Sequence, residues 1–416
     1  MKKQWKRLAA LSSAVIMAAG TLLYFPTDTL QNISWGITAS AEETGEGTES
    51  GSQTWNEDDG LTWTLDADGT LTISGTGAMM DIPAFNNSNI KKVVIQEGVT
   101  SIGERAFEGC TVLTSITIPK SVTSIGYRAF FDTPWLTNKQ KDTPLVIVNG
   151  ILIDGTACSG EVTIPDGVTN IGIGAFCNCT GLTSINIPKS VTSIGEGTFD
   201  NCTGLTNITI PKSVESVGDR AFYGCDKLTV NLENGSKLTS ENLGVDASKI
   251  VTYWNEGNLT WTLTADGTMT ISGTGTMKDY YNENSPATQK KGNVKKVVIE
   301  EDVTSIGMYA FSGCISLTDI TIPGSVTSIG YSAFQNTTWL KNKQNESPIV
   351  IVNGILIDGR TCSGEVTIPN NVTSIGNYAF YECTGLTSIE IPEGVKSIGA
   401  NAFSDCTGLT SITIPK

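Results

Sequence analysis

The segment "IPKSVTSIGEGTFDNCTGLTNITIPKSV", residues 187–214, ends on the words with which it begins, and the second copy starts 23 residues after the first. The apolar residue before the glycine of the phrase "SIG" repeats at this interval, or at twice this interval, within each of two sets. Its positions are Ile102, Ile125, Ile171, Ile194 and Val217 in the first set, and Ile306, Ile329, Ile375 and Ile398 in the second. A fixed period of about 20 to 50 residues is typical of solenoid proteins, in which each repeat forms one unit of a stack.

A degenerate copy fills the one 46-residue gap in each set. Val148 stands 23 residues after Ile125 in "PLVIVNGILIDG", with Asn149 in place of the glycine, and Val352 stands in the same place in the second set. Counting these copies gives eleven turns, six in the first set and five in the second.

Each unit reads as a short strand, a bend, a return segment that carries Ala-Phe, and another bend. In the unit that begins at Cys202, the residues 208–210 alternate apolar and polar, as expected of a strand with one buried face. Pro211 has no N–H to give to a sheet and ends the strand, and Gly218 permits a tight bend. One unit cannot bury its own apolar face, so the units must stack, about 4.8 Å apart, with identical side chains in ladders. The phenylalanine ladder comprises Phe107, Phe130, Phe176, Phe199, Phe222, Phe311, Phe334, Phe380 and Phe403.

The phrases "IPKSVTSIGYRAF" (118–130) and "CTGLTSITIP" (406–415) resemble the BspA-type leucine-rich repeats of bacterial surface proteins. The resemblance covers residues 91–232 and 295–416 in several repeats that keep register. It implies a curved solenoid with a parallel sheet on one face. It also implies secreted or surface-exposed proteins that are often linked to adhesion and to host or cell–cell contact, and it specifies no ligand.

The repeat array is duplicated. Cys110, Cys158, Cys179 and Cys202 each recur 204 positions later, and "LTWTLDADGTLTISGTG" (61–77) returns as "LTWTLTADGTMTISGTG" (259–275). Apolar residues alternate on both sides of the Asp-Gly pair at 68–69, which predicts a β-hairpin. A calcium loop is the alternative for "DADG" (66–69), but the second copy lacks the first acid and no glutamate follows at the required spacing. An exposed solenoid end needs a cover, so we interpret each hairpin as a cap.

The fold class is therefore a β-rich leucine-rich-repeat solenoid, with parallel strands stacked every 23 residues in two modules that each open with a β-hairpin cap. The basic start, the apolar stretch 8–25 and the "ASA" at 39–41 predict a secretory signal, with an uncleaved N-terminal anchor as the alternative. The predicted parts are a signal or anchor (1–41), an acidic Gly/Ser/Thr linker (42–53), cap 1 (54–90), repeat module 1 (91–232), a connector (233–253), cap 2 (254–294) and repeat module 2 (295–416).

The composition excludes several kinds of chemistry. The 416 residues include no histidine, which removes Ser-His-Asp and Cys-His nucleophilic systems and the commonest metal ligand. The formal net charge of −15 argues against nucleic acid as a partner. The cysteines have no C-x-x-C spacing for zinc. We expect no enzyme activity, no metal and no cofactor.

Seven cysteines occupy one column of the repeat. They are Cys110, Cys179, Cys202, Cys225, Cys314, Cys383 and Cys406. One interpretation is a ladder of small buried thiols beside the phenylalanines. The other is disulfides between adjacent turns, such as Cys179 to Cys202, because the strand spacing lies within the allowed Cα separation.

Two surfaces are candidates for binding. The outward strand positions form a neutral, hydroxyl-rich sheet face, although threonine also simply suits an exposed strand. This face includes Thr114, Thr117, Thr183, Asn186, Thr206 and Thr209. The second surface follows the "IGxxAF" turns, where Tyr and Arg, which are enriched at interface hot spots, recur. It includes Arg105, Tyr127, Arg128, Arg220, Tyr309, Tyr331 and Tyr378.

Trp135 and Trp339 lie at the degenerate turns, where each either fills the space left by the interrupted unit or belongs to a loop that holds a ligand. The expected function is a secreted or bacterial cell-surface protein that mediates adhesion through its solenoid surface. Its partners would be an extracellular protein or a cell-surface ligand, host matrix included, with no membrane insertion of the mature chain. The alternatives are a carbohydrate-binding accessory module, for which flat exposed aromatic rings are usual, and a spacer that projects another domain.

Overall fold

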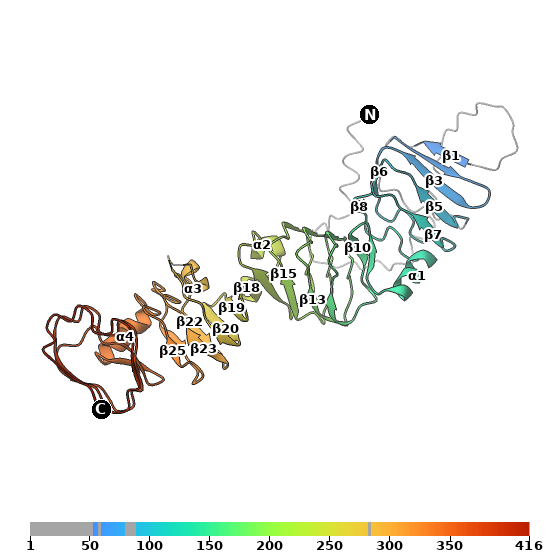
Figure 1. Ribbon diagram of the computed structural model, residues 1–416. Helices are drawn as coiled ribbons and strands as arrows, with labels where there is room; N and C mark the ends of the chain where they lie inside the picture. The colour runs from blue at the N-terminus through green and yellow to red at the C-terminus, as the bar shows by residue number, and fades with distance from the viewer. Residues whose placement is uncertain (1–52, 57–59, 80–88, 282–283, 416) are drawn as a thin grey trace, which may run out of the picture. The chain divides into compact units, whose positions relative to one another are not determined.

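The computed structural model describes residues 53–56, 60–79, 89–281 and 284–415 (Figure 1). It is a β-solenoid of about 14 turns. The predicted signal or anchor (1–41) and the linker up to residue 52 lie outside the described residues. The solenoid has more turns than the eleven predicted, because the hairpins and the connector also add strands to the stack.

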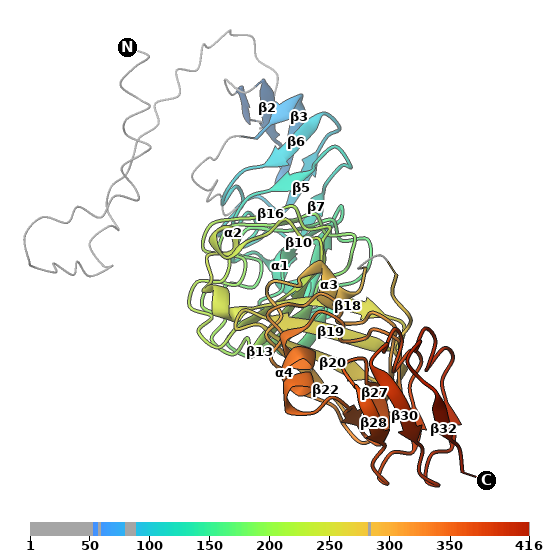
Figure 2. The same cartoon turned by 90° about the vertical axis from the view of Figure 1, so that its left-hand side faces the viewer.

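The longer strands form the first face of the solenoid. The first sheet has the order β1 (Gln53–Asn56), β2 (Leu61–Leu65), β3 (Thr70–Gly75), β5 (Lys92–Ile95), β7 (Ser115–Thr117). The second sheet has the order β11 (Gly160–Thr163), β13 (Leu182–Asn186), β15 (Asn207–Ile210), β17 (Thr229–Glu233), β18 (Ile250–Glu256), β19 (Leu259–Thr264), β20 (Thr268–Gly273), β22 (Lys296–Ile299), β24 (Asp319–Thr321). The third sheet has the order β28 (Gly364–Thr367), β30 (Leu386–Glu390), β32 (Ser411–Thr413). Figure 2 shows the last three side by side.

The 23-residue stacking is confirmed by the register of the parallel strands. Ile185 pairs with Ile208, and Asn186 pairs with Thr209, in β13 and β15. The predicted strand at 208–210 is β15, and it ends immediately before Pro211. The side chains of Ile208 and Ile210 are buried, as the alternation predicts.

A second face, which the repeat pattern did not reveal as strands, is built mainly from the "SI" phrases. In module 1 one sheet has the order β4 (Gly77–Ala78), β6 (Val99–Ile102), β8 (Ser124–Ile125), and another has the order β16 (Ser216–Val217), β14 (Ser193–Ile194), β12 (Asn170–Ile171), β10 (Ile151–Asp154), β9 (Val146–Val148). In the second half of the chain one sheet has the order β21 (Gly275–Thr276), β23 (Val303–Ile306), β25 (Ser328–Ile329), and another has the order β26 (Val350–Val352), β27 (Ile355–Asp358), β29 (Ser374–Ile375), β31 (Ser397–Ile398). The glycine after each "SI" is needed for close approach: a Cβ on Gly195 would lie 2.6 Å from the backbone nitrogen of Ile173 in the preceding turn.

The core consists of the predicted ladders. Phe199 is fully buried and stacks on Phe176 and Phe222, with ring centroids 5.2 and 5.5 Å apart. Phe403, near the end of the chain given, is only half-buried. Buried isoleucines, valines and cysteines, which also recur at equivalent positions of successive turns, belong to the same core as the phenylalanines. Stability therefore arises from contacts between neighbouring turns, as in other repeat proteins.

The two hairpins form as predicted, but the second is not at an exposed end. β19 and β20 pair antiparallel, and they lie inside the nine-stranded sheet between β18 and β22. The predicted connector supplies α2 (Ser240–Leu243), the short 3₁₀ helix η3 (Ala247–Lys249) and the first part of β18. β18 pairs with both β17 and β19, so the hydrogen-bonded sheet continues from module 1 into module 2.

The degenerate units differ from the prediction. Val148 and Val352 do not occupy the isoleucine column. In module 1, β9 and β10 form an antiparallel pair, and Leu152 of β10, not Val148 of β9, is in register with Ile171 of β12. Leu356 takes the same place in module 2. Each degenerate unit also carries an unpredicted helix, α1 (Pro134–Asp142) in module 1 and α4 (Thr338–Glu346) in module 2; the remaining short helix is α3 (Pro286–Gln289).

Candidate functional site

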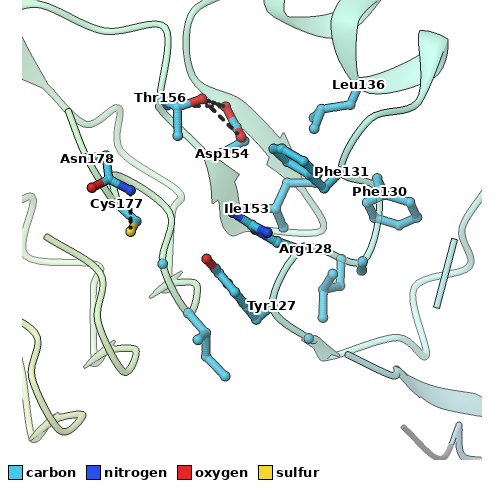
Figure 3. Close-up of a pocket in the computed structure, with 15 residues that line it drawn as sticks. Tyr127, Arg128, Phe130, Phe131, Leu136, Ile153, Asp154, Thr156, Cys177 and Asn178 are labelled. Atoms are coloured by element: carbon cyan, nitrogen blue, oxygen red, sulfur yellow. Dashed lines mark hydrogen bonds between the residues drawn. The ribbon is translucent and has the colours of Figure 1, made fainter. Parts of the chain in front are cut away.

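A cavity of about 200 Å³ lies at the interrupted turn of module 1 (Figure 3). The unit that contains β10 has no Ala-Phe turn, so the phenylalanine ladder passes from Phe130 to Phe176 without a member between them. The first turn of α1 fills the buried part of this gap with Trp135 and Leu136. The outer part stays open between the flanking turns, and we call it the Asp154 cavity.

Helix α1 begins where it does because the sequence supplies both of its start signals. The Thr133 hydroxyl accepts a hydrogen bond from the backbone N–H of Leu136 at 3.2 Å, and Pro134 follows as the first helical residue. The same hydroxyl donates to the carbonyl of Phe130 at 2.7 Å. The cap therefore fixes the helix to the phenylalanine ladder and sets one wall of the cavity.

Asp154 follows the buried part of β10 and turns its carboxylate into the cavity region. This carboxylate accepts hydrogen bonds from Gln140 Nε2 at 3.0 Å, from the Thr156 backbone N–H at 3.2 Å and from the Thr156 hydroxyl at 3.0 Å. The bond to the backbone two residues later is a typical Asx turn. All three donors are neutral, so they hold the carboxylate in place without cancelling its charge.

Arg128 and Tyr127 line the cavity from the preceding "IGxxAF" turn. Arg128 has a φ of 54°, a left-handed conformation that few residues other than glycine adopt. Its guanidinium lies over the Phe131 ring, 4.4 Å from the centroid, and its Nη1 is 3.8 Å from Glu108 Oε1. These contacts place the Arg128 cation along the wall of the cavity.

Cys177 and Asn178 line the cavity from the following turn. The Asn178 amide donates to the Cys177 sulfur at 3.2 Å. Burial, with a further contribution from Asp200, raises the pKa of the Cys177 thiol, whereas Arg128 lowers it. The thiol is therefore neutral near pH 7 and is poorly suited to act as a nucleophile.

Module 2 contains the equivalent site at Asp358, but its cavity is much smaller. Asp358, the counterpart of Asp154, forms an ion pair with Arg360, whose Nε and Nη2 lie 2.7 and 2.5 Å from Asp358 Oδ2. Arg360 stands where module 1 has Thr156. The remaining cavity measures about 30 Å³.

The residues of the predicted "IGxxAF" surface are exposed or half-buried in the turns, and they differ between the modules. In module 2 the rings of Tyr309, Tyr331, Tyr378 and Tyr381 form a row, with successive centroids 5.6, 4.4 and 5.5 Å apart. Tyr309 and Tyr378 have φ values of 55° and 56°, which is unusual for a bulky residue. In module 1, Arg105 lies next to Glu104 and Glu108, and Arg220 pairs with Asp200 at 3.2 Å.

The predicted sheet face is exposed, but its threonines have two roles. Thr206 donates its hydroxyl to the Thr183 carbonyl of the preceding turn, and Thr114 donates to the Lys91 carbonyl. These threonines tie turns together at the start of the strands. The outward positions within the strands are Thr117, Asn186 and Thr209, with Tyr253 as an aromatic residue that the sequence analysis did not place there.

The two tryptophans are buried and cannot be part of an accessible surface. Trp135 packs on Phe130 and Trp339 packs on Phe334, with ring centroids 4.7 and 4.8 Å apart. Their inclusion among the candidate binding residues was wrong, because both rings replace the missing ladder member. The first of the two interpretations, in which each tryptophan fills the space left by the interrupted unit, is therefore the one that the structure supports.

The cysteine column is a ladder of thiols in the structure. No disulfide joins the cysteines, all of which lie among the described residues. Cys202 donates to the Phe176 carbonyl at 3.0 Å and Cys225 donates to the Phe199 carbonyl at 3.1 Å. The Cys179–Cys202 disulfide alternative is therefore not what the structure contains.

Asp154, Thr156 and Cys177 were not predicted from the sequence as site residues. The available signal was the absence of Ala-Phe after "ILIDG", together with the difference between Thr156 and Arg360 at equivalent positions of the duplicated modules. Among the described residues, no group of three or more cysteine and acidic side chains is arranged to hold a metal ion. None of the helices in the described ranges has the length and apolar character that a membrane span requires.

The fold and its surfaces define a leucine-rich-repeat solenoid, a class that normally presents binding surfaces rather than catalytic sites. The family model described as the BspA type leucine rich repeat region matches in six copies, over residues 80–144, 155–243, 285–353 and 360–416. The chain belongs to this family. Comparison with curated proteins gives no match.

Three solved structures are similar to this chain. A leucine rich cell surface protein from Faecalibacterium prausnitzii A2-165 is 25% identical, over 86% of this chain and 94% of that one, with a TM-score of 0.24. A leucine-rich repeat protein from Eubacterium ventriosum is 23% identical, over 88% and 85%, with a TM-score of 0.24. One from Bacteroides ovatus is 20% identical, over 89% and 94%, with a TM-score of 0.25.

Proposed function

We propose that this protein is a secreted or cell-surface interaction protein that mediates adhesion through its solenoid surface. Its partner would be an extracellular protein or a cell-surface ligand, including components of a host matrix. Membership in the BspA-type family supports this proposal. The observation that carries it is the outward face of the nine-stranded sheet.

The outward side chains of this sheet lie in straight rows across the turns. One row contains Glu161, Ser184, Asn207 and Thr229, and the next contains Thr163, Asn186, Thr209 and Asn231. Hydroxyl and amide groups at fixed spacing can donate and accept hydrogen bonds, and they hold few charges that would have to be desolvated. Such a surface suits a protein partner.

The size of the face indicates how a partner would have to bind. Nine strands about 4.8 Å apart, each contributing about four residues of 3.3 Å, cover about 500 Å². A stable interface buries about 800 Å² on each partner. The partner must therefore also contact side chains outside the strands of this face.

The proposal is tested by measuring binding of the purified chain to immobilised extracellular-matrix proteins and to whole bacterial and host cells. A double variant, Asn186→Lys with Thr209→Lys, places two charges on the sheet face. The matched control, Thr169→Lys with Thr192→Lys, places two charges on exposed positions beside the second face. We expect at least a tenfold loss with the first variant only. Equal losses, or no binding of the parent chain to any of these surfaces, would refute the proposal.

Carbohydrate binding is a second candidate, favoured by one observation. The row of four tyrosines in module 2 provides an aromatic surface of adjacent rings, and aromatic rings are the usual platforms for sugars. A glycan array tests this candidate. The relevant variant is Tyr331→Ala with Tyr378→Ala, because Trp135 and Trp339 are buried. A glycan signal that survives this variant would eliminate the tyrosine row as the binding site.

A further inference from the structure

We propose that the Asp154 cavity receives an arginine side chain presented by a partner protein. This inference rests on the proposed interaction function and adds the chemistry that the partner must present. Three features support it: the filled counterpart of the cavity in module 2, the neutral hydrogen-bond partners of Asp154, and the charges around the opening.

Module 2 shows how this site is filled when the chain supplies the ligand itself. The guanidinium of Arg360 contacts one carboxylate oxygen of Asp358, Oδ2, through both Nε and Nη2, so a guanidinium can pair with the carboxylate at this position. Module 1 has the same aspartate at Asp154 but carries Thr156 in place of the arginine. The duplicated chain thus contains one copy in which an arginine of the chain itself meets the aspartate and one copy in which threonine replaces that arginine.

Several lining side chains differ in size between the two cavities. Thr156 and Gly174 stand where module 2 has the larger Arg360 and Tyr378, whereas Arg128 and Phe131 stand where module 2 has the smaller Ser332 and Gln335. The cavity measures about 200 Å³ in module 1 and about 30 Å³ in module 2. Its lining includes Ile153 and Ile173, which offer apolar contact to the aliphatic stem of an arginine.

The charge of Asp154 favours a cation. Its hydrogen-bond donors, Gln140 and Thr156, are neutral, and no cation of the described residues lies within ion-pair distance of it. An adjoining cavity of about 300 Å³ shares Tyr127, Ile173 and Cys177 with this one and adds Glu196 and Asp200. Arg220 is already paired with Asp200. The carboxylates around the two cavities therefore outnumber the cations.

Arg128 is the observation that opposes this inference, because an anionic ligand could bind to it. Its guanidinium already lies over the Phe131 ring and close to the Glu108 carboxylate, so its charge is partly compensated by these two side chains. Module 2 has Ser332 at the equivalent position. Replacing Arg128 with serine therefore tests the sign of the ligand charge: an arginine should bind more tightly after the change, and an anion should bind less tightly.

The experiment titrates the full chain with N-acetyl-L-arginine amide and follows binding by saturation-transfer NMR and calorimetry. The citrulline derivative has nearly the same shape without the charge, and the lysine derivative has the charge without the planar fork. We expect a dissociation constant on the order of millimolar for the arginine derivative, as befits so small a ligand. The lysine derivative should bind more weakly, and the citrulline derivative should not bind.

Four variants locate the binding. Asp154→Asn keeps the shape and the Asx turn and should weaken binding by at least tenfold, and Thr156→Arg should abolish it by filling the cavity as Arg360 does. Arg128→Ser should strengthen binding several-fold. Asp166→Asn, at an exposed acid outside the cavity, should change nothing. Circular dichroism and thermal melting establish that each variant is folded.

The inference is overturned if the arginine derivative shows no saturable binding, if citrulline binds equally, or if Asp154→Asn has no effect. Loss of binding in Arg128→Ser would show that the ligand is recognised as an anion and would also overturn it. Matrix or cell binding that persists while the arginine derivative fails would remove only this inference. Arginine binding without any adhesion would remove only the proposed function.

Discussion

Replacing Phe199 with alanine should destabilise the protein by about 3–5 kcal/mol. Phe199 is fully buried and stacks between Phe176 and Phe222, with centroid distances of 5.2 and 5.5 Å. The substitution removes the ring from the core, leaves a cavity between two turns, and breaks two aromatic contacts, each worth about 0.5–1.5 kcal/mol. Ladder neighbours on both sides limit how far the cavity can collapse, which favours the upper half of the range.

The loss is measured from urea unfolding followed by far-UV circular dichroism, with hydrogen exchange to locate it. A repeat array can unfold in parts, so exchange should show the loss centred on β13 to β17 rather than spread evenly over the chain. The control is Phe403→Ala: this residue is half-buried and stacks on Phe380 alone among the phenylalanines, so it should lose about 1–2 kcal/mol. A loss below about 1 kcal/mol at Phe199, or equal losses at both positions, would refute the packing argument.

Three further predictions concern the turns, the helix cap and the thiols. Gly195→Ala should lower stability by about 1–3 kcal/mol in the same urea assay, because its Cβ would lie 2.6 Å from the backbone of the preceding turn, whereas Gly324→Ala, where a Cβ has open space, should be nearly neutral. Thr133→Ala should cost about 0.5–2 kcal/mol and loosen α1, seen as faster hydrogen exchange in 134–142, with Thr133→Ser retaining most of the stability; an unchanged exchange rate would contradict the capping role. Burial raises the pKa of Cys225 to about 11 from an ordinary value of 9.0, so unfolding releases its proton between these values and stability should fall as pH rises across that window; Cys225→Ala should reduce the slope, and an equal slope in both proteins would count against it.

The sequence predicted the repeating architecture well because the same local demands recur in every turn. The strand before Pro211, the burial of Ile208 and the stacked phenylalanines each follow from a residue type whose constraint is local or periodic. A single unit would have been ambiguous. Several units in register made the pattern readable, since each column can be occupied only by side chains that tolerate an identical neighbour.

The interrupted turns were not predictable in the same way. The 23-residue spacing pointed to Val148, but the antiparallel pair β9–β10 moves Leu152 into the column instead. Periodicity cannot detect such a local reversal, because it counts residues and not chain direction. The start of α1 could have been predicted from the capping residues Thr133 and Pro134. That Asp154 lines a cavity could not, because this depends on which side chains the interrupted turn leaves uncovered in three dimensions.

The two modules differ at positions that border the interruptions but not in the ladders. In the ladders, equivalent positions 204 residues apart keep the same side chain, as at Phe176 and Phe380 or at Cys179 and Cys383, because a change would disturb the turns on both sides. The positions that line the cavity and differ between the modules are Arg128 and Ser332, Phe131 and Gln335, Thr156 and Arg360, Ile173 and Asn377, Gly174 and Tyr378, Cys177 and Tyr381, and Asn178 and Glu382. These side chains border space that the missing ladder member no longer fills, so they can change without breaking a stack. A solenoid that must remain uniform in its core can thus acquire a distinct recognition site where one turn is incomplete.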